Sequence, residues 1–422
     1  MKEKIIKLVE LFLLLSPLFD MLTAFCLKVL NIDFTIGMIV RFIIMLICLF
    51  YIIFIYKKKD KKYLLLILGS IFIYLLIFLT VMIIDKDTSI LLYEGKNALR
   101  TFYFPILLIT FYAITKDNKT FINNKILITV YIIYLLGIFI PDILGIGFDS
   151  YEITKTGSIG FFNAANEISA IVSILMPFFL LYLYEKKSFI LTVLLIGVLV
   201  FDILSIGTKG PLLAFFLILG VIVLIYILYL VKTKLYKRLS LLLGIFVLFI
   251  FFLSVYLPRT AFYKNIEIHL DFLGVESIFE VLTDYELFDH FVFSSRLKFL
   301  SNTYDSYSKA PLQEKIFGIG YIENYNSDDE STKMIEMDYF DILFRHGIIG
   351  FILYISIFIY FLVKSIKHTI SLKNIPYKIC MSLSLFLIIL LAFMTGHVLL
   401  APSVSIFVAL ILTKKEGSLC EN

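Results

Sequence analysis

Long apolar runs constrain this chain more than any other feature of its sequence. Most of the chain consists of continuous runs of about 20 apolar residues, separated by short polar gaps. The mean hydropathy is +0.97 and 60% of the 422 residues are hydrophobic, which is more apolar surface than a water-soluble fold covers. Strands of a membrane barrel would alternate polar and apolar residues, so continuous runs indicate helices. The sequence therefore predicts an all-α polytopic membrane protein.

Apolar length and charged flanks predict about twelve transmembrane helices. They fall at 6–29, 35–56, 63–84, 97–115, 124–141, 166–184, 188–206, 209–231, 239–257, 338–363, 376–395 and 397–413. A polar stretch of about 80 residues, 258–337, interrupts them and is expected to be one large extracytoplasmic loop. The chain thus divides into nine helices at 1–257, this loop, and three helices with a short tail at 338–422.

The basic residues predict the orientation of these helices. With a cytoplasmic N-terminus every inner gap is basic, and these short gaps hold about 23 of the 38 Lys and Arg residues. Both termini are then cytoplasmic, and the 258–337 loop lies outside the cytoplasmic membrane. The net charge of +5 reflects this orientation and gives no support to nucleic-acid binding. The four cysteines lie outside the loop and form no Cys-x-x-Cys pair, so no disulfide or zinc site is expected.

Ionisable residues inside spans are functional candidates, because a charge in the bilayer costs about 2.5–3.5 kcal/mol or more. Arg41, Arg100, Lys209 and Arg345 fall in the outer halves of predicted spans. Lys209 lies in a glycine-rich break, where backbone can approach a ligand closely and the following helix N-terminus favours an anion. Together such cations suit a pyrophosphate, whose oxygens arginine binds in a bidentate manner. Each alone equally suits contact with lipid phosphate at the surface.

Other polar residues in or beside spans support more than one interpretation. Asp20, Asp202 and His397 are expected to be structural. Asn166 and Glu167 open a predicted span, where they either suit the first turn of a helix or line a substrate cavity.

The end of the long loop carries the clearest chemical pattern. A helix that starts near Asp338 would place Asp338, Asp341 and Arg345 on one face, with Asp341 and Arg345 paired. Glu336 precedes that helix and is free to point into a cavity beneath the loop. Partial burial would raise its pKa and make it a general base towards a sugar hydroxyl. Acidic residues are also common at helix starts with no such role.

Two further residues complete the candidate site. Arg296 is the best candidate in the loop for a phosphate or sugar contact, and its alternative is a surface arginine. Glu336, Arg296 and Asp338 are therefore the catalytic candidates. Tyr339 joins Asn166 and Glu167 as a candidate cavity residue.

The order of these motifs resembles the superfamily of O-antigen ligases and polymerases. The matching segments are GFFNAANE at 160–167, SIGTKGP at 205–211, SRL at 295–297, FGIG at 317–320 and the stretch 337–350, so the resemblance covers roughly 155–360. It implies glycosyl transfer outside the cytoplasmic membrane, from an undecaprenyl-pyrophosphate carrier to a sugar hydroxyl. It implies no nucleotide sugar, no metal and no other cofactor. It also implies that Arg296 and Arg100 bind the pyrophosphate, with Lys209 where an arginine is often found.

One departure from the family pattern favours a polymerase over a ligase. Many members, ligases especially, have His-Asn at the start of the span after the loop, whereas Glu336 and Met337 stand there in this chain. His346 lies too deep along the helix to substitute, which leaves Glu336 as the expected base. Cations would stabilise the charge on the leaving pyrophosphate while Glu336 deprotonates the acceptor, and a single displacement would invert the anomeric centre.

The resemblance implies partners, and three alternatives to a polymerase remain. The implied partners are lipid-linked donor and acceptor glycans and the bilayer, with a chain-length regulator and a flippase as further candidates. A ligase would transfer finished glycan to another acceptor. A flippase or other transporter is disfavoured because no internal repeat is visible. A purely structural membrane protein would not need loop acids and outer cations together.

Overall fold

The structure is a computed structural model that describes residues 1–33, 35–85, 88–118, 121, 124–151, 155–275, 278–321 and 334–414. It is 83% helical, and its only sheet within these residues is a two-stranded hairpin. The prediction of an all-α polytopic membrane protein is confirmed. The predicted tail after residue 414 and part of the predicted loop, at 322–333, lie outside the described residues.

Nine helices in the described ranges are long and apolar enough to cross a membrane. They are Ile36–Ile55 (α2, Ile36–Phe50, with η1, Tyr51–Ile55), Lys61–Ile84 within α3 (Lys61–Asp85), Thr88–Asp117 (η2, Thr88–Ile90, with α4, Leu91–Asp117), α5 (Asn124–Ile143), α6 (Ala165–Lys186), α7 (Phe189–Ile206), α8 (Lys209–Lys232), α15 (Asp338–Ser371) and α16 (Ile375–Met394). Three further helices, α1 (Lys2–Lys28), α9 (Tyr236–Tyr256) and α17 (Pro402–Thr413), coincide with the remaining predicted spans. Every predicted span therefore has a helical counterpart, whereas the number that cross the bilayer stays a prediction.

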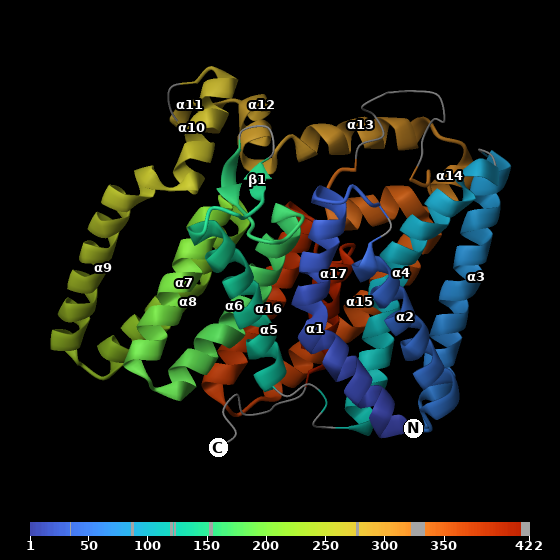
Figure 1. Ribbon diagram of the computed structural model, residues 1–422, viewed down its shortest axis with the longest axis horizontal. Coiled ribbons are helices and arrows are strands. Elements are labelled where there is room, and N and C mark those ends of the chain that lie inside the picture. Colours follow the sequence, from blue (N-terminus) through green and yellow to red (C-terminus); the bar gives the residue numbers. More distant parts are fainter. Residues whose placement is uncertain are drawn as a thin grey trace.

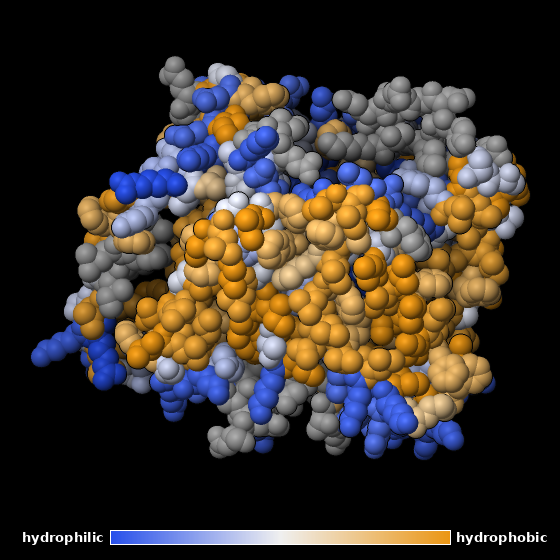
Figure 2. Space-filling view, viewed as in Figure 1, coloured by the Kyte–Doolittle hydropathy of each residue, from blue (hydrophilic) through white to orange (hydrophobic). Residues whose placement is uncertain are grey.

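The surface is arranged as a membrane requires. Figure 2 shows a broad apolar band on the visible face, with hydrophilic residues above and below it. Outward-facing side chains in this protein include many large hydrophobic ones, such as Leu66, Phe72 and Leu194, which are 64%, 62% and 61% exposed. Hydrocarbon chains would cover such residues, whereas water would not tolerate a band of this extent.

The interior of the bundle is built around α4, α6 and α17. Buried residues make up 83% of the apolar window in α4 and 78% in α6, but only 17% in α8. Helix α17 packs against both α4 and α6. The three cysteines in the described residues, Cys26, Cys48 and Cys380, are free and buried within helices.

The segment predicted as a long loop is largely helical where it is described. After η3 (Leu257–Arg259) come α10 (Ala261–Leu273), α11 (Ile278–Thr283), α12 (Tyr285–Phe288), η4 (Asp289–Phe293), α13 (Arg296–Lys309) and α14 (Leu312–Phe317). Together with the hairpin of β1 (Asp149–Tyr151) and β2 (Thr156–Ser158), they lie at the end of the bundle opposite the start of α1 (Figure 1). The helices are short because the polar sequence has no apolar run long enough for a span.

The end of this segment is docked onto a break in α15. Gly347 has φ 63° and ψ −173° inside the helix, and Gly318 has φ 99°. At Gly318 a Cβ would overlap the backbone of Arg345, so only glycine permits the approach. The Ile319 and Gly320 amides then donate to the carbonyls of Phe344 and Arg345, over 2.9 and 3.1 Å. The Gly-x-Gly motif therefore fixes where the polar segment returns to the membrane helices.

Hydrogen bonds of His346 stabilise this docking. It is completely buried, and its Nε2 is 2.9 Å from the Tyr321 hydroxyl. The Tyr74 hydroxyl donates to its backbone carbonyl over 2.8 Å. The expectation that His346 lies too deep along the helix to substitute for the family histidine stays a prediction.

The helix in the last predicted span begins later than the sequence pattern predicts. The sequence pattern places a span over 397–413, but α17 begins at Pro402, and 396–401 are non-helical. Gly396 and His397 have φ of 60° and 58°, which a helix excludes. Proline is favoured in the first turn of a helix and disfavours helix before it, so Pro402 marks the true start.

Candidate active site

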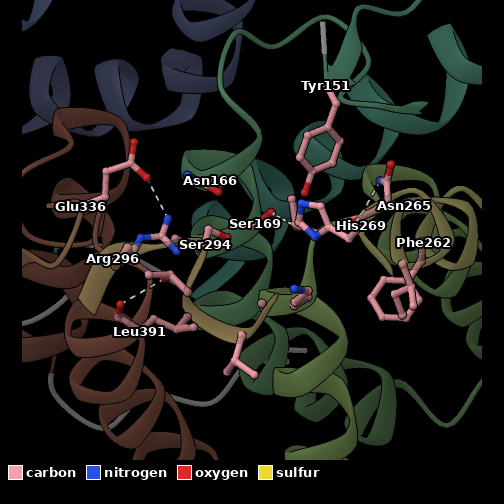
Figure 3. A pocket seen from close by; sticks show the side chains of 18 of the residues that line it. Tyr151, Asn166, Ser169, Phe262, Asn265, His269, Ser294, Arg296, Glu336 and Leu391 are labelled. Atoms are coloured by element: carbon pink, nitrogen blue, oxygen red, sulfur yellow. Dashed lines mark hydrogen bonds and ion pairs between the residues drawn. The ribbon is translucent and has the colours of Figure 1, made fainter. Parts of the chain in front are cut away.

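A cavity of about 310 Å³, lined by both polar and apolar side chains, lies where the helices of the polar segment meet the ends of α6 and α8. Figure 3 shows its labelled side chains converging from these elements. Its lining consists mainly of polar, basic and aromatic groups together with glycines: Tyr151, Asn166, Ser169, Gly207, Thr208, Lys209, Gly210, Phe262, Asn265, His269, Ser294, Arg296, Glu336 and Thr395. Four of the candidates from the sequence, Asn166, Lys209, Arg296 and Glu336, therefore share one cavity.

Arg296 is the first residue of α13 and is held by strained backbone. Ser294 and Ser295 before it adopt φ of 55° and 64°, in the left-handed region that such residues rarely occupy. The Arg296 side chain is 8% exposed. One terminal nitrogen donates to Glu336 over 2.8 Å and the other to the Phe293 carbonyl over 3.3 Å. Its buried Nε has no hydrogen-bond partner in the described residues.

The backbone N–H groups at the start of α13 are satisfied within the protein. The Asp289 carboxylate accepts from the amides of Leu297 and Lys298, over 3.0 and 2.9 Å. This cap occupies the end of the helix, so the guanidinium of Arg296 is what α13 offers to an anion.

Lys209 occupies the equivalent place at the start of α8. Its ammonium donates to the Phe291 carbonyl and lies 4.1 Å from the centroid of the Phe291 ring. The N-cap residue Thr208 makes no capping bond, because its hydroxyl pairs with that of Ser169. Residues 207–210 line the cavity, so the positive end of α8 adds to the charges of Lys209 and Arg296.

Glu336 stands opposite these cations on strained backbone, with φ of 61°. Its side chain is 35% exposed, and it forms ion pairs with Arg296 at 2.8 Å and with His397 at 3.8 Å. Burial alone would raise the pKa of this carboxyl. The charge of His397, with the charge and hydrogen bond of Arg296, outweighs burial and lowers the pKa to about 2.

The expectation that burial raises the pKa of Glu336 is therefore wrong. Two cationic partners stabilise the ionised form more than partial burial penalises it. A carboxylate with this pKa is charged at neutral pH and accepts a proton poorly, because an efficient general base has a pKa near the working pH.

His397 is expected from the sequence to be structural, and the structure places it beside Glu336. The residue lies between α16 and α17, with φ of 58° and a side chain that is 25% exposed. The position of the family's His-Asn pair holds Glu336 and Met337, as the sequence shows, but a histidine from a distant part of the chain lies beside Glu336 in space. Burial would lower the pKa of His397, but the acids Glu336, Glu167 and Asp338 raise it. Gly396 and Pro402, which bracket a short non-helical stretch, were the available signals.

Asp338, Tyr339 and His397 are not among the residues that line the cavity, and of the three His397 lies beside the lining residue Glu336. Asp338 is 1% exposed, and one of its carboxylate oxygens accepts from the amides of Val398 and Leu399 over 2.9 and 2.7 Å. It therefore ties the stretch that carries His397 to the start of α15. Tyr339 packs its ring 6.4 Å from that of Phe358.

Glu167 and Arg100 form a second polar group on the other side of His397. The Glu167 carboxylate accepts from the Ser403 hydroxyl and lies 3.6 Å from an Arg100 nitrogen. Arg100 is 47% exposed, so it retains contact with the surroundings. The negative charge of Glu167, like that of Glu336, raises the pKa of His397.

Arg41 lies away from the cavity, inside the helical bundle. It pairs with Asp20, and the second carboxylate oxygen of Asp20 accepts from the Tyr134 hydroxyl over 2.6 Å. Near Glu336, the Asp341 carboxylate accepts from the amides of Ile335 and Met337, over 3.0 and 3.1 Å, which caps α15.

The fold and the cavity define a class. The chain is a multi-pass α-helical membrane protein with a cavity, lined in part by Lys209, Arg296 and Glu336, at one end of its helical bundle. The family model for O-antigen ligase like membrane proteins matches residues 2–281 and 279–415, and the chain belongs to this family. The resemblance of the motifs is thus confirmed. No curated protein gives a significant match.

Proposed function

We propose that this protein polymerises undecaprenyl-pyrophosphate-linked oligosaccharide repeat units outside the cytoplasmic membrane, by inverting glycosyl transfer. The products would be polysaccharides of the capsular or O-antigen type. Membership of the family supports a membrane enzyme that polymerises or ligates lipid-linked glycans. The donor and the acceptor would both enter from the bilayer, and a flippase and a chain-length regulator would act beside the enzyme.

The observation that carries this proposal is the meeting of Arg296, Lys209 and the N-terminus of α8 at one cavity. A pyrophosphate is the leaving group that such an arrangement suits. Guanidinium and ammonium groups form charge-assisted hydrogen bonds with its oxygens, and the helix terminus adds partial positive charge. These groups stabilise the charge that develops as the glycosidic bond breaks.

The rest of the cavity suits the sugars. Tyr151 and Phe262 offer aromatic faces, and Asn166 and Ser294 offer amide and hydroxyl groups (Figure 3). The acceptor hydroxyl oxygen attacks the anomeric carbon, and the bond from that carbon to the pyrophosphate breaks with its electron pair. The helices of the polar segment cover the cavity, which disfavours hydrolysis by water.

A ligase is the second candidate. The argument against it from the sequence is that Glu336 and Met337 stand where many ligases have His-Asn, and the structure weakens this argument because His397 lies 3.8 Å from Glu336. The same cations would serve a donor that carries finished glycan, so the two enzymes differ in their acceptor.

The test is the glycan profile of a strain that lacks this protein, resolved by chain length and by attachment to lipid. We expect single repeat units to accumulate at the outer face and long chains to vanish. Arg296→Ala should reproduce that loss, whereas Arg259→Ala, at an exposed arginine outside the cavity lining, should restore long chains.

Two other profiles would contradict the polymerase. Long lipid-linked chains that persist without transfer to a final acceptor would establish the ligase. Repeat units trapped at the cytoplasmic face would exclude both enzymes and indicate a transporter.

A further inference from the structure

We infer that His397 is the catalytic base, which takes the proton of the acceptor hydroxyl, and that Glu336 is the positioning residue that orients and charges its imidazole. This inference rests on the proposed glycosyl transfer. It assigns the proton to a residue that lies about 60 positions further along the chain than Glu336 and reaches the site through a separate loop.

The backbone at this point is built to bring the two side chains together. Glu336 and His397 both adopt left-handed φ values, 61° and 58°, which cost free energy in residues that carry a Cβ. Gly396, with φ of 60°, lies directly against the backbone carbonyl of Glu336, where a Cβ would overlap. Strain of this kind persists only where surrounding contacts maintain it, and it concentrates at functional sites.

Asp338 provides contacts that maintain this strained backbone. Its carboxylate is buried and holds the amides of Val398 and Leu399, the two residues after His397. The stretch that carries the imidazole is therefore bound to the start of α15, immediately beside Glu336. Neither partner can move without breaking charge-assisted hydrogen bonds in a buried region.

The imidazole itself is poised without being satisfied. Its Nε2 is buried, has no hydrogen-bond partner in the described residues and lies 3.8 Å from a Glu336 oxygen. Distances of this kind between catalytic groups often shorten when substrate binds. A carboxylate that holds an imidazole is the usual way to prepare a histidine as a general base.

The charged groups that act on His397 come from separate parts of the chain. Glu336 and Asp338 face it from the start of α15, and Glu167 faces it from α6. Arg296 forms an ion pair with Glu336, and Arg100 forms an ion pair with Glu167. The three acids stabilise the imidazolium that forms when the proton arrives, while Arg296 keeps Glu336 ionised.

The proposed step is balanced in atoms and charge. The acceptor O–H bond breaks and its proton moves to the imidazole. The electron pair of that bond allows the oxygen to form the new bond to the anomeric carbon. The pyrophosphate leaves with the electron pair of the old bond, and the imidazolium later releases its proton to water.

The first test is the pH dependence of polymerisation. The wild-type protein is reconstituted in vesicles with lipid-linked repeat units extracted from the strain that lacks it. The rate should rise with pH as the imidazole loses its proton, because only the neutral form accepts one. His397→Gln should remove this rise and slow the reaction roughly 100-fold. Glu336→Gln should move the rise to lower pH, since the neutral amide no longer stabilises the imidazolium.

Two results would overturn the assignment. A rise with pH that persists in His397→Gln would mean that another group accepts the proton. A rate that falls as pH rises and loses that fall in His397→Gln would make His397 a cationic ligand of the pyrophosphate. His368→Gln, at the far end of α15, is the matched control and should retain the wild-type profile.

A second test needs no activity. The chain has five histidines, so NMR of histidine-labelled protein can follow each ring, and His397→Gln identifies the relevant signal. The pKa of His397 should fall in Glu336→Gln, and an unchanged pKa would contradict the pairing. Vesicles of wild-type protein that form no polymer would overturn the proposed function, and this titration would still report on the pair.

Discussion

This protein contains two arginine–carboxylate pairs that differ in their surroundings and in their remaining capacity for hydrogen bonds. Arg41 and Asp20 lie on α2 and α1 within the bundle, with side chains that are 15% and 10% exposed. The second oxygen of Asp20 is taken by Tyr134. The carboxylate is thus satisfied from both sides, which is what a buried ion pair needs to be tolerated.

Arg296 and Glu336 show the opposite arrangement. They lie on or directly beside strained backbone at the edge of the cavity, and Arg296 keeps a buried Nε without a partner. Glu336 is 35% exposed and also faces His397. From this comparison we expect the pair that is held by regular helices, with both carboxylate oxygens hydrogen-bonded, to be structural. The pair with remaining capacity at a cavity is the one available to a substrate.

The largest expected difference is between Arg296→Ala and Arg41→Ala. Arg296→Ala should lower polymer formation per inserted molecule by roughly 100-fold or more, because a preorganised charge opposite the leaving group is lost. Arg41→Ala should instead lower the amount of folded protein, because Asp20 is left as an uncompensated buried charge. Quantitative blotting of membranes, with polymer yield per molecule, separates the two effects.

An Arg41→Ala protein that inserts normally but forms no polymer would contradict the structural role expected of Arg41. Arg41 would then bind pyrophosphate, as the sequence alone suggests. Replacement of both members of the bundle pair, Asp20→Leu with Arg41→Met, should recover folded protein, since an apolar pair tolerates that site. The corresponding double change at Arg296 and Glu336 should recover no activity.

Asp338→Asn should have the next largest effect. The amide keeps one acceptor oxygen but loses the charge that holds Val398 and Leu399, which is worth about 1.5–3 kcal/mol. We expect about tenfold slower polymerisation with the rise with pH retained, because His397 remains present but is less well placed. Initial rates in vesicles measure this, and a complete loss with its pH dependence abolished would make Asp338 itself the proton acceptor.

Tyr134→Phe should affect stability alone. It removes the hydroxyl that donates to Asp20 and leaves that buried carboxylate one hydrogen bond short, at a cost of about 1.5–3 kcal/mol. Thermal unfolding in detergent should shift downward while the rate per folded molecule stays at the wild-type value. A slower rate at unchanged stability would place the Arg41 pair in the catalytic machinery.

The smallest expected effect is a difference in stability between wild type and Glu336→Gln at low pH. It is small because Glu336 is 35% exposed and water screens its interactions. The pKa of Glu336, about 2 in the folded protein, lies below the value of about 4.3 of an unfolded chain. The stabilisation by this carboxylate is therefore present above about pH 4.3 and lost as the pH falls towards 2. Unfolding curves from pH 5 to 3 should fall more steeply for wild type than for Glu336→Gln, and parallel curves would contradict the lowered pKa.

The helices could be predicted because the signal for them is local. An apolar run of sufficient length excludes water-exposed structure without reference to the rest of the chain. The one clear error, the start of the last span, arose where apolar residues continue through a non-helical stretch. Hydropathy does not distinguish Val398 and Leu399 in a buried loop from the same residues in a helix.

The candidate site was partly predictable for a different reason. Lys209, Arg296 and Glu336 were recognised by residue type beside a break or a polar segment, and the structure brings these three to one cavity. Arg100 and Arg41 have the same chemistry and were grouped with them, yet each lies with its own carboxylate. Residue type identifies a cation but says nothing about which acid it meets.

The sequence by itself determined that this is a helical membrane protein with a polar segment between its ninth and tenth predicted spans, and it supplied the cations and acids for a site. Only the tertiary structure decided the partners: Arg41 with Asp20, Arg100 with Glu167, and His397 with Glu336. Electrostatic interactions in a medium of low dielectric depend on distances of a few ångströms, which helix packing sets. The sign of the pKa shift at Glu336 therefore follows from His397, a residue that no local pattern connects to it.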